Sequence, residues 1–268
     1  MGVKYDIEDN RFVFDYTHDE KTDVIALTGE LQQSQAFGQC FYYAYEFTED
    51  VDGTVRTSFI KHLKFPEKPL KQMPELTQFI QNAVNRLNKA IDLYDYDLIV
   101  YPESSSAVNS YIMRYMYRFA QPMLREMQLV KALPENISFD MDGYSKQYLN
   151  AVLENGRSRY TEAQKEQVKA SIEEMMDLIH KKEYFTIAKD VKKAKWRPYI
   201  TKFLTYASEE DKELCERISN NNILVVDDIA TSGSTLNEVI RALRVLNDSN
   251  KITIFSLLGR KDLMAESM

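Results

Sequence analysis

The stretch that most constrains the fold of this chain is "ILVVDDIATSGSTLNEV", which runs from Ile223 to Val239. A short apolar run ends in two adjacent carboxylates, Asp227 and Asp228, and a loop of small and hydroxyl residues then leads into a helical pattern. An apolar strand flanked by helices is typical of the centre of a parallel sheet. In open α/β sheets, ligands gather at the carboxyl ends of such strands, so we expect a binding site here.

The loop and the aspartates favour different chemical groups. Gly233 allows the backbone to turn tightly, and the helix that follows offers free N–H groups and a partial positive charge at its N-terminus. Such a terminus binds anions, phosphate in particular. Asp227 and Asp228 favour hydroxyl donors or a cation. A sugar phosphate carries both kinds of group, so we interpret the stretch as a site for a phosphorylated sugar.

Other interpretations of this stretch account for less of it. Thr235 is expected to cap the helix, with Glu238 completing a capping box, but capping does not account for two carboxylates. P-loop ATPases also have an apolar strand that ends in Asp, yet none of the 8 glycines fits the pattern GxxxxGK[ST]. A phosphorelay receiver domain has its acidic pair near the start of its sheet, whereas here the pair comes late in the sequence. The glycine fingerprint of dinucleotide-binding folds is absent as well.

The rest of the chain alternates between helix and strand patterns. A helix is predicted at about 72–91, a buried strand at Leu98–Tyr101, a helix at about 107–119 and a strand at 127–133. The last strand is predicted at Ile252–Leu258. This order predicts an α/β fold with an open, mainly parallel sheet and flanking helices.

The first part of the chain does not follow this alternation. We expect residues 1–70 to form a cap, with residues 71–268 as the α/β domain. Aromatic and β-branched residues at Phe41–Thr48 and Thr54–Phe65, with a turn at Asp52-Gly53 between them, predict a β-hairpin in this cap.

A long helical insert is expected at about 134–205. Thr161 and Gln164 have the spacing of a capping box. Apolar residues at helical spacing follow, and we interpret them as a packing face: Val168, Ile172, Met175, Met176 and Ile179. Trp196 is interpreted as a core anchor. A further helix is predicted at Tyr206–Ile218.

Composition narrows the class of protein. Hydrophobic residues make up 44% and charged residues 28%, as in ordinary globular proteins. The formal net charge of −7 argues against broad binding to nucleic acid or to a membrane surface. The 2 cysteines, Cys40 and Cys215, form no CxxC pair. No signal-peptide pattern and no apolar run of the roughly 18 residues needed to span a bilayer is found, so we expect a cytoplasmic protein.

The stretch around Asp227 resembles the phosphoribosyl-diphosphate (PRPP) signature of the type I phosphoribosyltransferases. That signature is an apolar strand, two acidic residues, two loosely apolar positions and then Thr-(Thr/Ser)-Gly-x-Thr. The resemblance implies that Asp227 and Asp228 bind the 2- and 3-hydroxyls of the ribose and are the catalytic residues. It implies that the 5-phosphate is bound by the loop residues Ala230, Thr231, Ser232, Gly233, Ser234 and Thr235.

The family has an earlier loop that holds the pyrophosphate. The loop after Leu98–Tyr101 resembles it and consists of Glu103, Ser104, Ser105 and Ser106. Many members carry Arg or Lys in this loop and this chain does not, so a serine-rich helix cap is the alternative. Lys131, after the next strand, is the candidate for a basic residue that faces the pyrophosphate, with an ordinary edge lysine as the alternative.

The resemblance implies transfer of ribose 5-phosphate from PRPP to a nitrogen of an unidentified small-molecule acceptor, with release of pyrophosphate. Mg²⁺ is the implied cofactor, held mainly through the substrate, with Asp227 and Asp228 as candidate protein ligands. Thr231 stands where purine-salvage members often have an Asp that assists at the base, which argues against a hypoxanthine/guanine enzyme of the usual kind. Dimers are common in the family, so a homodimer is a candidate assembly.

Two alternatives to an active transferase stay open. Leu257-Leu258-Gly259-Arg260 resembles the ending of ComF-type members, so a ComF-like accessory protein is one. A PRPP or nucleotide sensor without turnover is the other, because the loop at 103–106 has no basic residue. The insert takes the place of the family's mobile loop, which makes its basic residues candidates as a cluster, against a solvated basic face: Lys189, Lys192, Lys193, Lys195 and Arg197.

Overall fold

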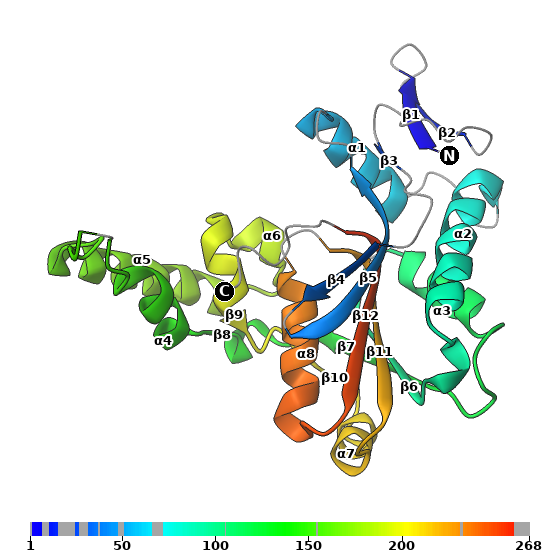
Figure 1. Cartoon of the computed structure of the whole chain (residues 1–268). Helices are drawn as coiled ribbons and strands as arrows, with labels where there is room; N and C mark the ends of the chain where they lie inside the picture. Colours follow the sequence, from blue (N-terminus) through cyan, green and yellow to red (C-terminus); the bar gives the residue numbers. More distant parts are fainter. Residues whose placement is uncertain are drawn as a thin grey trace.

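The computed structural model describes residues 2–6, 11–15, 25–26, 32–36, 38–47, 51–65, 72–104, 106–153, 155–230 and 233–259. Within these residues, ten strands form one sheet in the order β10-β7-β6-β11-β12-β5-β3-β1-β2, with β4 paired to β5 (Figure 1). The strands are β1 (Gly2–Asp6), β2 (Arg11–Asp15), β3 (Ile25–Ala26), β4 (Gln32–Ala36), β5 (Gln39–Phe47), β6 (Leu98–Pro102), β7 (Arg125–Lys131), β10 (Leu204–Tyr206), β11 (Asn222–Ile229) and β12 (Lys251–Leu258).

The middle of the sheet is parallel. The neighbouring strands β7, β6, β11, β12 and β5 all run in one direction. At one edge β10 is antiparallel to β7, and on the other side β4 is antiparallel to β5. Nearly every residue of β11 is buried, which is expected of a parallel strand covered on both faces. The predicted open, mainly parallel sheet is therefore confirmed.

Helices cover both faces of the sheet. Ile223 and Val225 of β11 belong to one hydrophobic core, under α7 (Glu209–Arg217) and α8 (Ser234–Leu246). Leu224 and Val226 belong to the other, under α1 (Gly53–Lys64), α2 (Pro74–Ala90) and α3 (Val108–Met116). This alternation follows from the two-residue period of a strand. Figure 1 shows α8 on one side of the sheet and α2 and α3 on the other.

The predicted elements of the α/β region are confirmed, with small shifts at their ends. The helix predicted at 72–91 is α2, and the strands predicted at Leu98–Tyr101 and 127–133 are β6 and β7. The helix predicted at 107–119 is α3. The helix predicted at Tyr206–Ile218 begins later than expected, because Leu204–Tyr206 is the strand β10 and α7 starts at Glu209.

The hairpin predicted at Phe41–Thr48 and Thr54–Phe65 is wrong, since the second segment is the helix α1. Asp52 is not a turn residue but the N-cap, and its carboxylate accepts hydrogen bonds from the N–H groups of Thr54 (2.7 Å) and Val55 (3.4 Å). The buried residues of α1, Phe59 and Leu63, are four positions apart and so lie on one face of a helix.

The first segment, β5, is a strand of the main sheet. It pairs in parallel with β12, and Cys40 lies opposite Thr253. It also pairs with β4 through a turn at Gly38, which has the positive φ of 72° that favours glycine. Residues 1–70 therefore contribute strands to the α/β sheet, in addition to α1 and the β1–β2 hairpin that stand at one end of it (Figure 1).

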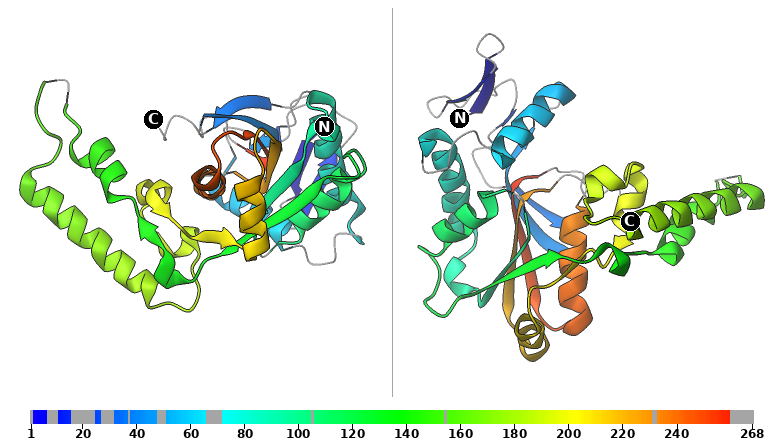
Figure 2. Two further views of the ribbon diagram at one scale, coloured as in Figure 1. Left: turned by 90° about the horizontal axis from the view of Figure 1, so that it is seen from below. Right: turned by 180° about the vertical axis from the view of Figure 1, so that it is seen from behind.

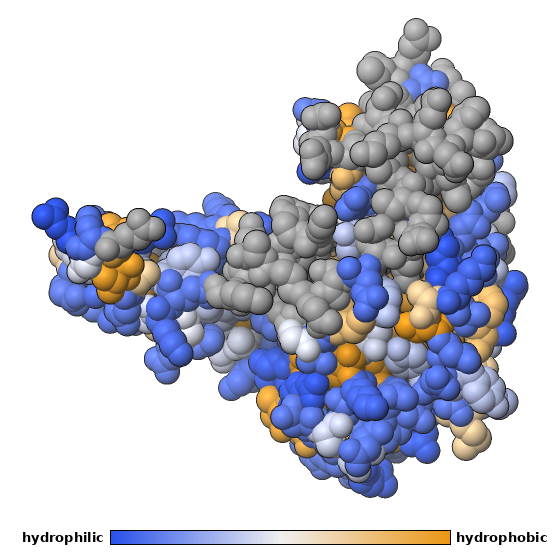
Figure 3. Space-filling model, in the orientation of Figure 1, coloured by the Kyte–Doolittle hydropathy of each residue, from blue (hydrophilic) through white to orange (hydrophobic). Residues whose placement is uncertain are grey.

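The insert forms an arm that projects from the sheet (Figure 2). The strands β8 (Ser138–Phe139) and β9 (Ile200–Thr201) pair at its base, and α4 (Met141–Tyr144), α5 (Glu162–His180) and α6 (Ile187–Asp190) follow the chain between them. Shorter helical segments are η2 (Leu93–Asp95), η3 (Pro134–Asn136), η4 (Ser145–Leu149) and η5 (Ala194–Tyr199). In the space-filling view the arm is mainly hydrophilic, with a small apolar patch near its tip (Figure 3).

The predictions for the insert are confirmed in their main points. Thr161 and Gln164 form both hydrogen bonds of a capping box at the start of α5. Ile172, Met176 and Ile179 are buried, and Val168 and Met175 pack against them, so the apolar stripe is a packing face. Among the described residues, no helix combines the length and the apolar character that are needed to cross a membrane.

Candidate functional site

A cavity of about 250 Å³ opens at the carboxyl ends of β6 and β11. This is where the topology of an open α/β sheet places ligands. The cavity brings together residues that lie far apart in the sequence and were predicted to form one site: Glu103, Ser104, Lys131, Asp227, Asp228 and Thr235.

The acidic pair lies on the wall of this cavity and is buried. Asp227 is 6% exposed and Asp228 is 1% exposed. The N–H of Asp228 donates to Oδ1 of Asp227 at 2.9 Å, so the backbone fixes the first carboxylate. Asp228 is contacted by two other side chains, since Lys64 Nζ lies 3.1 Å from Oδ1 and the Ser104 hydroxyl is 3.5 Å from Oδ2.

The surroundings of Asp227 disfavour the ionised form of its carboxyl group. Burial raises its pKa above the ordinary value of 3.8, and the nearby charge of Asp228 raises it further. The ammonium group of Lys64 and the hydrogen bond from the N–H of Asp228 act in the opposite direction. A hydroxyl donor or a cation that approaches the two carboxylates would favour the ionised form of Asp227, so the pair is suited to either kind of group.

The N-terminus of α8 has features of an anion site. Gly233 takes a positive φ of 69°, which glycine adopts without strain, and it is the N-cap residue of α8. No side chain of the described residues caps this end of the helix. The N–H groups of a first helical turn have no partner within the helix, which is why helix N-termini in general favour anions.

The predicted capping box at this helix is wrong. Thr235 lies inside the helix and lines the cavity instead of capping. Glu238 is buried, and its two carboxylate oxygens accept hydrogen bonds from Arg241, both at 2.7 Å. Among the other loop residues, Ala230 gives its N–H to the carbonyl of Leu258 at 2.8 Å and Ser234 is buried. Thr231 and Ser232 lie outside the described residues.

The loop after β6 divides into two parts. Glu103 and Ser104 line the cavity, and the Glu103 carboxylate accepts the N–H of Lys131 at 2.9 Å, which ties the ends of β6 and β7 together. Ser106 is buried, and its hydroxyl accepts the N–H of Val108 at 3.0 Å, so it serves the start of α3 as a helix cap does. Ser105 lies outside the described residues.

Lys131 lines the cavity at the end of β7 and its side chain is exposed. Within the part of the chain that the structure describes, its ammonium group has no ion pair. Lys131 is therefore a candidate contact for a ligand anion in this cavity.

Two parts of the cavity wall were not predicted from the sequence. Lys64 comes from the last turn of α1, a segment that was taken for a strand. The insert contributes Phe185, Thr186, Ile187 and Ala188, and Arg197 fastens this segment by donating to the carbonyls of Val191 (2.9 Å) and Ala188 (3.0 Å). The sequence makes the insert's basic residues candidates for the site as a cluster, and of these Arg197 lines this cavity whereas Lys189, Lys192, Lys193 and Lys195 do not.

Among the described residues, no group of three or more His, Cys, Asp or Glu side chains is arranged so that it could hold a metal ion by itself. The cavity does hold three carboxylates, those of Glu103, Asp227 and Asp228. Mg²⁺ is usually bound through one or two carboxylates together with the phosphates of a substrate. The residues present therefore fit Mg²⁺ only when a bound substrate completes its coordination.

Comparison with known proteins adds little to this geometry. No family model matches the chain, and no curated protein shows significant similarity to it. Among the solved structures, the chain is similar to a hypoxanthine phosphoribosyltransferase from Staphylococcus aureus, with 13% identity and a TM-score of 0.34. The match covers 69% of this chain and 66% of that one, so it spans less than two thirds of that protein. Because this similarity is so low, the function of the cavity has to be inferred from the chain's own residues.

Proposed function

We propose that this protein is a phosphoribosyltransferase that transfers ribose 5-phosphate from PRPP to a nitrogen of a small-molecule acceptor and releases pyrophosphate. The observation that carries the proposal is the single cavity that joins Asp227, Asp228 and Thr235 to Ser104 and Lys131. These residues come from the ends of β6, β7 and β11 and from the first turn of α8, and together they match the hydroxyls and the two anionic ends of PRPP.

Each group of residues is assigned to one part of the substrate. Asp227 and Asp228 accept hydrogen bonds from the ribose 2- and 3-hydroxyls. The N-terminus of α8, with Gly233 and Thr235, holds the 5-phosphate. Ser104 and Lys131 contact the pyrophosphate.

The chemistry requires positioning more than a covalent nucleophile. The bond from ribose C1 to pyrophosphate breaks, pyrophosphate leaves with the electron pair, and the acceptor nitrogen bonds to C1 and loses a proton. Positive charge develops on the sugar, next to the buried carboxylates of Asp227 and Asp228, and preorganised charges of this kind stabilise a transition state. Lys131 stabilises the negative charge on the leaving group.

Mg²⁺ is proposed as the cofactor, with Asp227 and Asp228 as the residues that would hold it together with substrate oxygens. Bound there, it would neutralise charge on the leaving pyrophosphate. The acceptor is proposed to lie against Phe185–Ala188, because this segment of the insert forms the wall of the cavity that no residue assigned to PRPP occupies.

Calorimetry with PRPP and Mg²⁺ tests the binding part of the proposal. Wild type is expected to bind, and Asp227→Asn/Asp228→Asn is expected to bind at least roughly tenfold more weakly, because hydroxyl hydrogen bonds to charged acceptors are lost. Absence of binding to wild type, or equal affinity in both proteins, would rule the proposal out. Incubation with PRPP and a panel of bases and amines, followed by a pyrophosphate assay, tests the transfer itself.

A PRPP sensor without turnover is the second candidate. It is favoured by the ion pair between Lys64 and Asp228, since a catalytic carboxylate engaged by lysine must be released before it can bind a ribose hydroxyl. The absence of a basic residue at Glu103, Ser104 and Ser106 points the same way. Binding of PRPP without pyrophosphate release from any acceptor in the panel would favour the sensor.

A further inference from the structure

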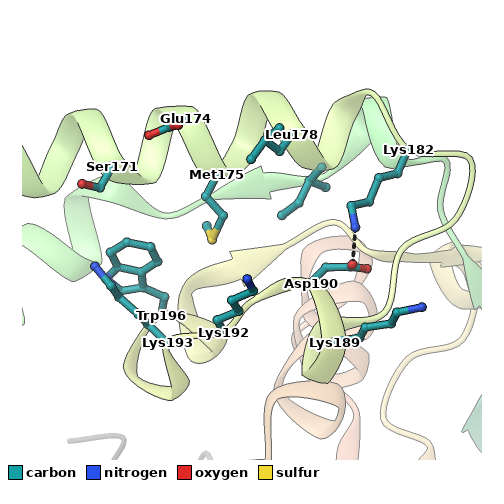
Figure 4. Close-up of a pocket in the computed structure, with 11 residues that line it drawn as sticks. Ser171, Glu174, Met175, Leu178, Lys182, Lys189, Asp190, Lys192, Lys193 and Trp196 are labelled. Carbon is teal, nitrogen blue, oxygen red and sulfur yellow. Dashed lines mark hydrogen bonds and ion pairs between the residues drawn. The ribbon is translucent and has the colours of Figure 1, made fainter.

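A second cavity lies on the arm, between α5 and the segment 189–196 (Figure 4). Its volume is about 510 Å³, which is in the size range of small-molecule sites. We call it the lysine groove, after the lysines on its rim. It shares no lining residue with the cavity that holds Asp227 and Asp228.

The floor of the lysine groove is apolar. Met175, Leu178 and Ile179 come from α5, and Trp196 comes from the opposite side. Leu178 is 58% exposed, although burying a leucine side chain is favourable. Trp196 is only 4% exposed and belongs to the core of the arm, where it donates its Nε1–H to the hydroxyl of Tyr144 at 3.2 Å, so it supports the floor from below.

The rim of the groove carries excess positive charge on one side. Lys182 is neutralised by Asp190, whose carboxylate also accepts the N–H of Thr186 at 2.7 Å. Lys189, Lys192 and Lys193 are exposed, and the structure gives them no ion pair within the residues it describes.

The side chains of two of these lysines are directed toward the groove. The ammonium group of Lys193 lies over the Trp196 ring, 4.1 Å from its centroid, which is a cation–π contact. The ammonium group of Lys192 points into the space between α5 and α6 (Figure 4). Glu174, on α5, is the carboxylate on the far side of the groove.

These charges stand out because the whole chain carries a net charge of −7. A local group of three lysines that form no ion pair with any other described residue, beside apolar surface, attracts an anion that also has an apolar part. A fully hydrophilic anion would leave Leu178 and Met175 in water, and a neutral apolar molecule would leave the lysines unpaired.

We propose that the lysine groove is a binding site for a small amphipathic anion. Its aromatic or acyl body would lie on Met175 and Leu178. Its carboxylate, sulfonate or phosphate would lie among Lys189, Lys192 and Lys193.

A titration with 1-anilinonaphthalene-8-sulfonate tests the proposal, because this fluorescent probe has an aromatic body and a single sulfonate. Wild type is expected to give a saturable fluorescence increase. Lys192→Gln/Lys193→Gln is expected to bind the probe roughly tenfold more weakly, because two charge contacts are lost. The matched control is Lys181→Gln/Lys195→Gln, which removes two exposed lysines near the groove that do not line it, and it is expected to bind as wild type does.

The neutral analogue N-phenyl-1-naphthylamine separates charge from apolar contact. It is expected to bind more weakly than the sulfonate and to be unaffected by Lys192→Gln/Lys193→Gln, whereas Leu178→Ser is expected to weaken both probes. Circular dichroism spectra that match wild type would show that the variants are folded. A non-saturable fluorescence increase in wild type, or equal sulfonate affinity in the two double lysine variants, would overturn the proposal.

Discussion

Asp227 illustrates how a pair of buried carboxylates concentrates unfavourable energy in a single residue. Its carboxylate is buried beside that of Asp228, and both burial and the neighbouring charge raise its pKa. Between the ordinary value and the raised one, the folded chain keeps a proton that the unfolded chain has released. The folded state therefore binds more protons in this window, and its stability falls as the pH rises.

Asp227→Asn should consequently stabilise the ligand-free protein at neutral pH. Asparagine cannot ionise, and its side-chain oxygen can still accept the N–H of Asp228. We expect the substitution to raise the free energy of unfolding by about 1 kcal/mol near neutral pH. In a chain of this size, that gain raises the melting temperature by roughly 2–4 °C. The gain should disappear toward about pH 4, where the Asp227 carboxyl is protonated in the unfolded chain as well. Thermal unfolding across this pH range measures it. A variant less stable than wild type at neutral pH would contradict the argument.

The contact between Lys64 and Asp228 gives a second prediction at the residue scale. Asp228 is almost fully buried, whereas the Lys64 side chain is 30% exposed. Lys64→Met should lower the free energy of unfolding by about 1–3 kcal/mol, because it leaves a buried carboxylate without its cation. In Asp228→Asn the same change should have a much smaller effect. Urea unfolding of the four proteins of this double-mutant cycle measures the coupling, and additive effects would show that the pair contributes nothing.

At the scale of elements, local patterns predicted the helices and strands whose burial follows one period. β11, with its apolar run, and α2, with its apolar stripe, are examples. The segment Thr54–Phe65 was misassigned because its threonines, valine and phenylalanines favour strands locally. Phe59 and Leu63 have to be buried under the same sheet face, and this long-range requirement selects a helix.

A substitution at Gly259 tests whether β5 packs against the end of β12 as part of the main sheet. Its N–H donates to the carbonyl of Tyr45 at 3.0 Å, and a Cβ at this position would lie 2.5 Å from Cγ and 2.6 Å from Cβ of Tyr43. These atoms are at the base of a buried ring, so β5 would have to shift. Gly259→Ala is expected to destabilise the fold by about 1–3 kcal/mol in urea unfolding.

Gly53→Ala is the matched control for this change. Gly53 is the first residue of α1, and a Cβ there would meet no atom within 4 Å. The substitution is expected to be neutral or to stabilise by about 0.4–1 kcal/mol, because alanine reduces the freedom of the unfolded chain. Equal destabilisation by both changes would mean that the close approach of Gly259 to Tyr43 does not determine the effect.

At the scale of the whole molecule, the sequence predicted the candidate site only in part. Asp227, Asp228 and Thr235 lie within one short motif, so their proximity follows from local structure. Lys64 reaches the same cavity from α1, and Phe185–Ala188 reach it from the arm. No local pattern encodes these approaches, because they depend on how α1 and the insert pack against the sheet.

The arm also connects the two cavities. α6 contributes Ile187 and Ala188 to the candidate active site, and the next two residues, Lys189 and Asp190, line the lysine groove. An anion bound in the groove would restrict the motion of α6. PRPP binding in the other cavity would then cost less conformational entropy, because α6 would already be ordered. Binding at the two sites is therefore expected to be mutually favourable.

Calorimetry can measure this coupling directly. With saturating 1-anilinonaphthalene-8-sulfonate, the affinity for PRPP with Mg²⁺ is expected to increase by roughly fivefold, at the lower end of typical allosteric coupling. Saturating PRPP should tighten binding of the sulfonate by the same factor, because coupling free energies are reciprocal. Lys192→Gln/Lys193→Gln should require roughly tenfold more sulfonate for the same effect, while leaving the intrinsic PRPP affinity unchanged. If both ligands bind to wild type but neither changes the affinity of the other, α6 does not transmit binding between the two sites.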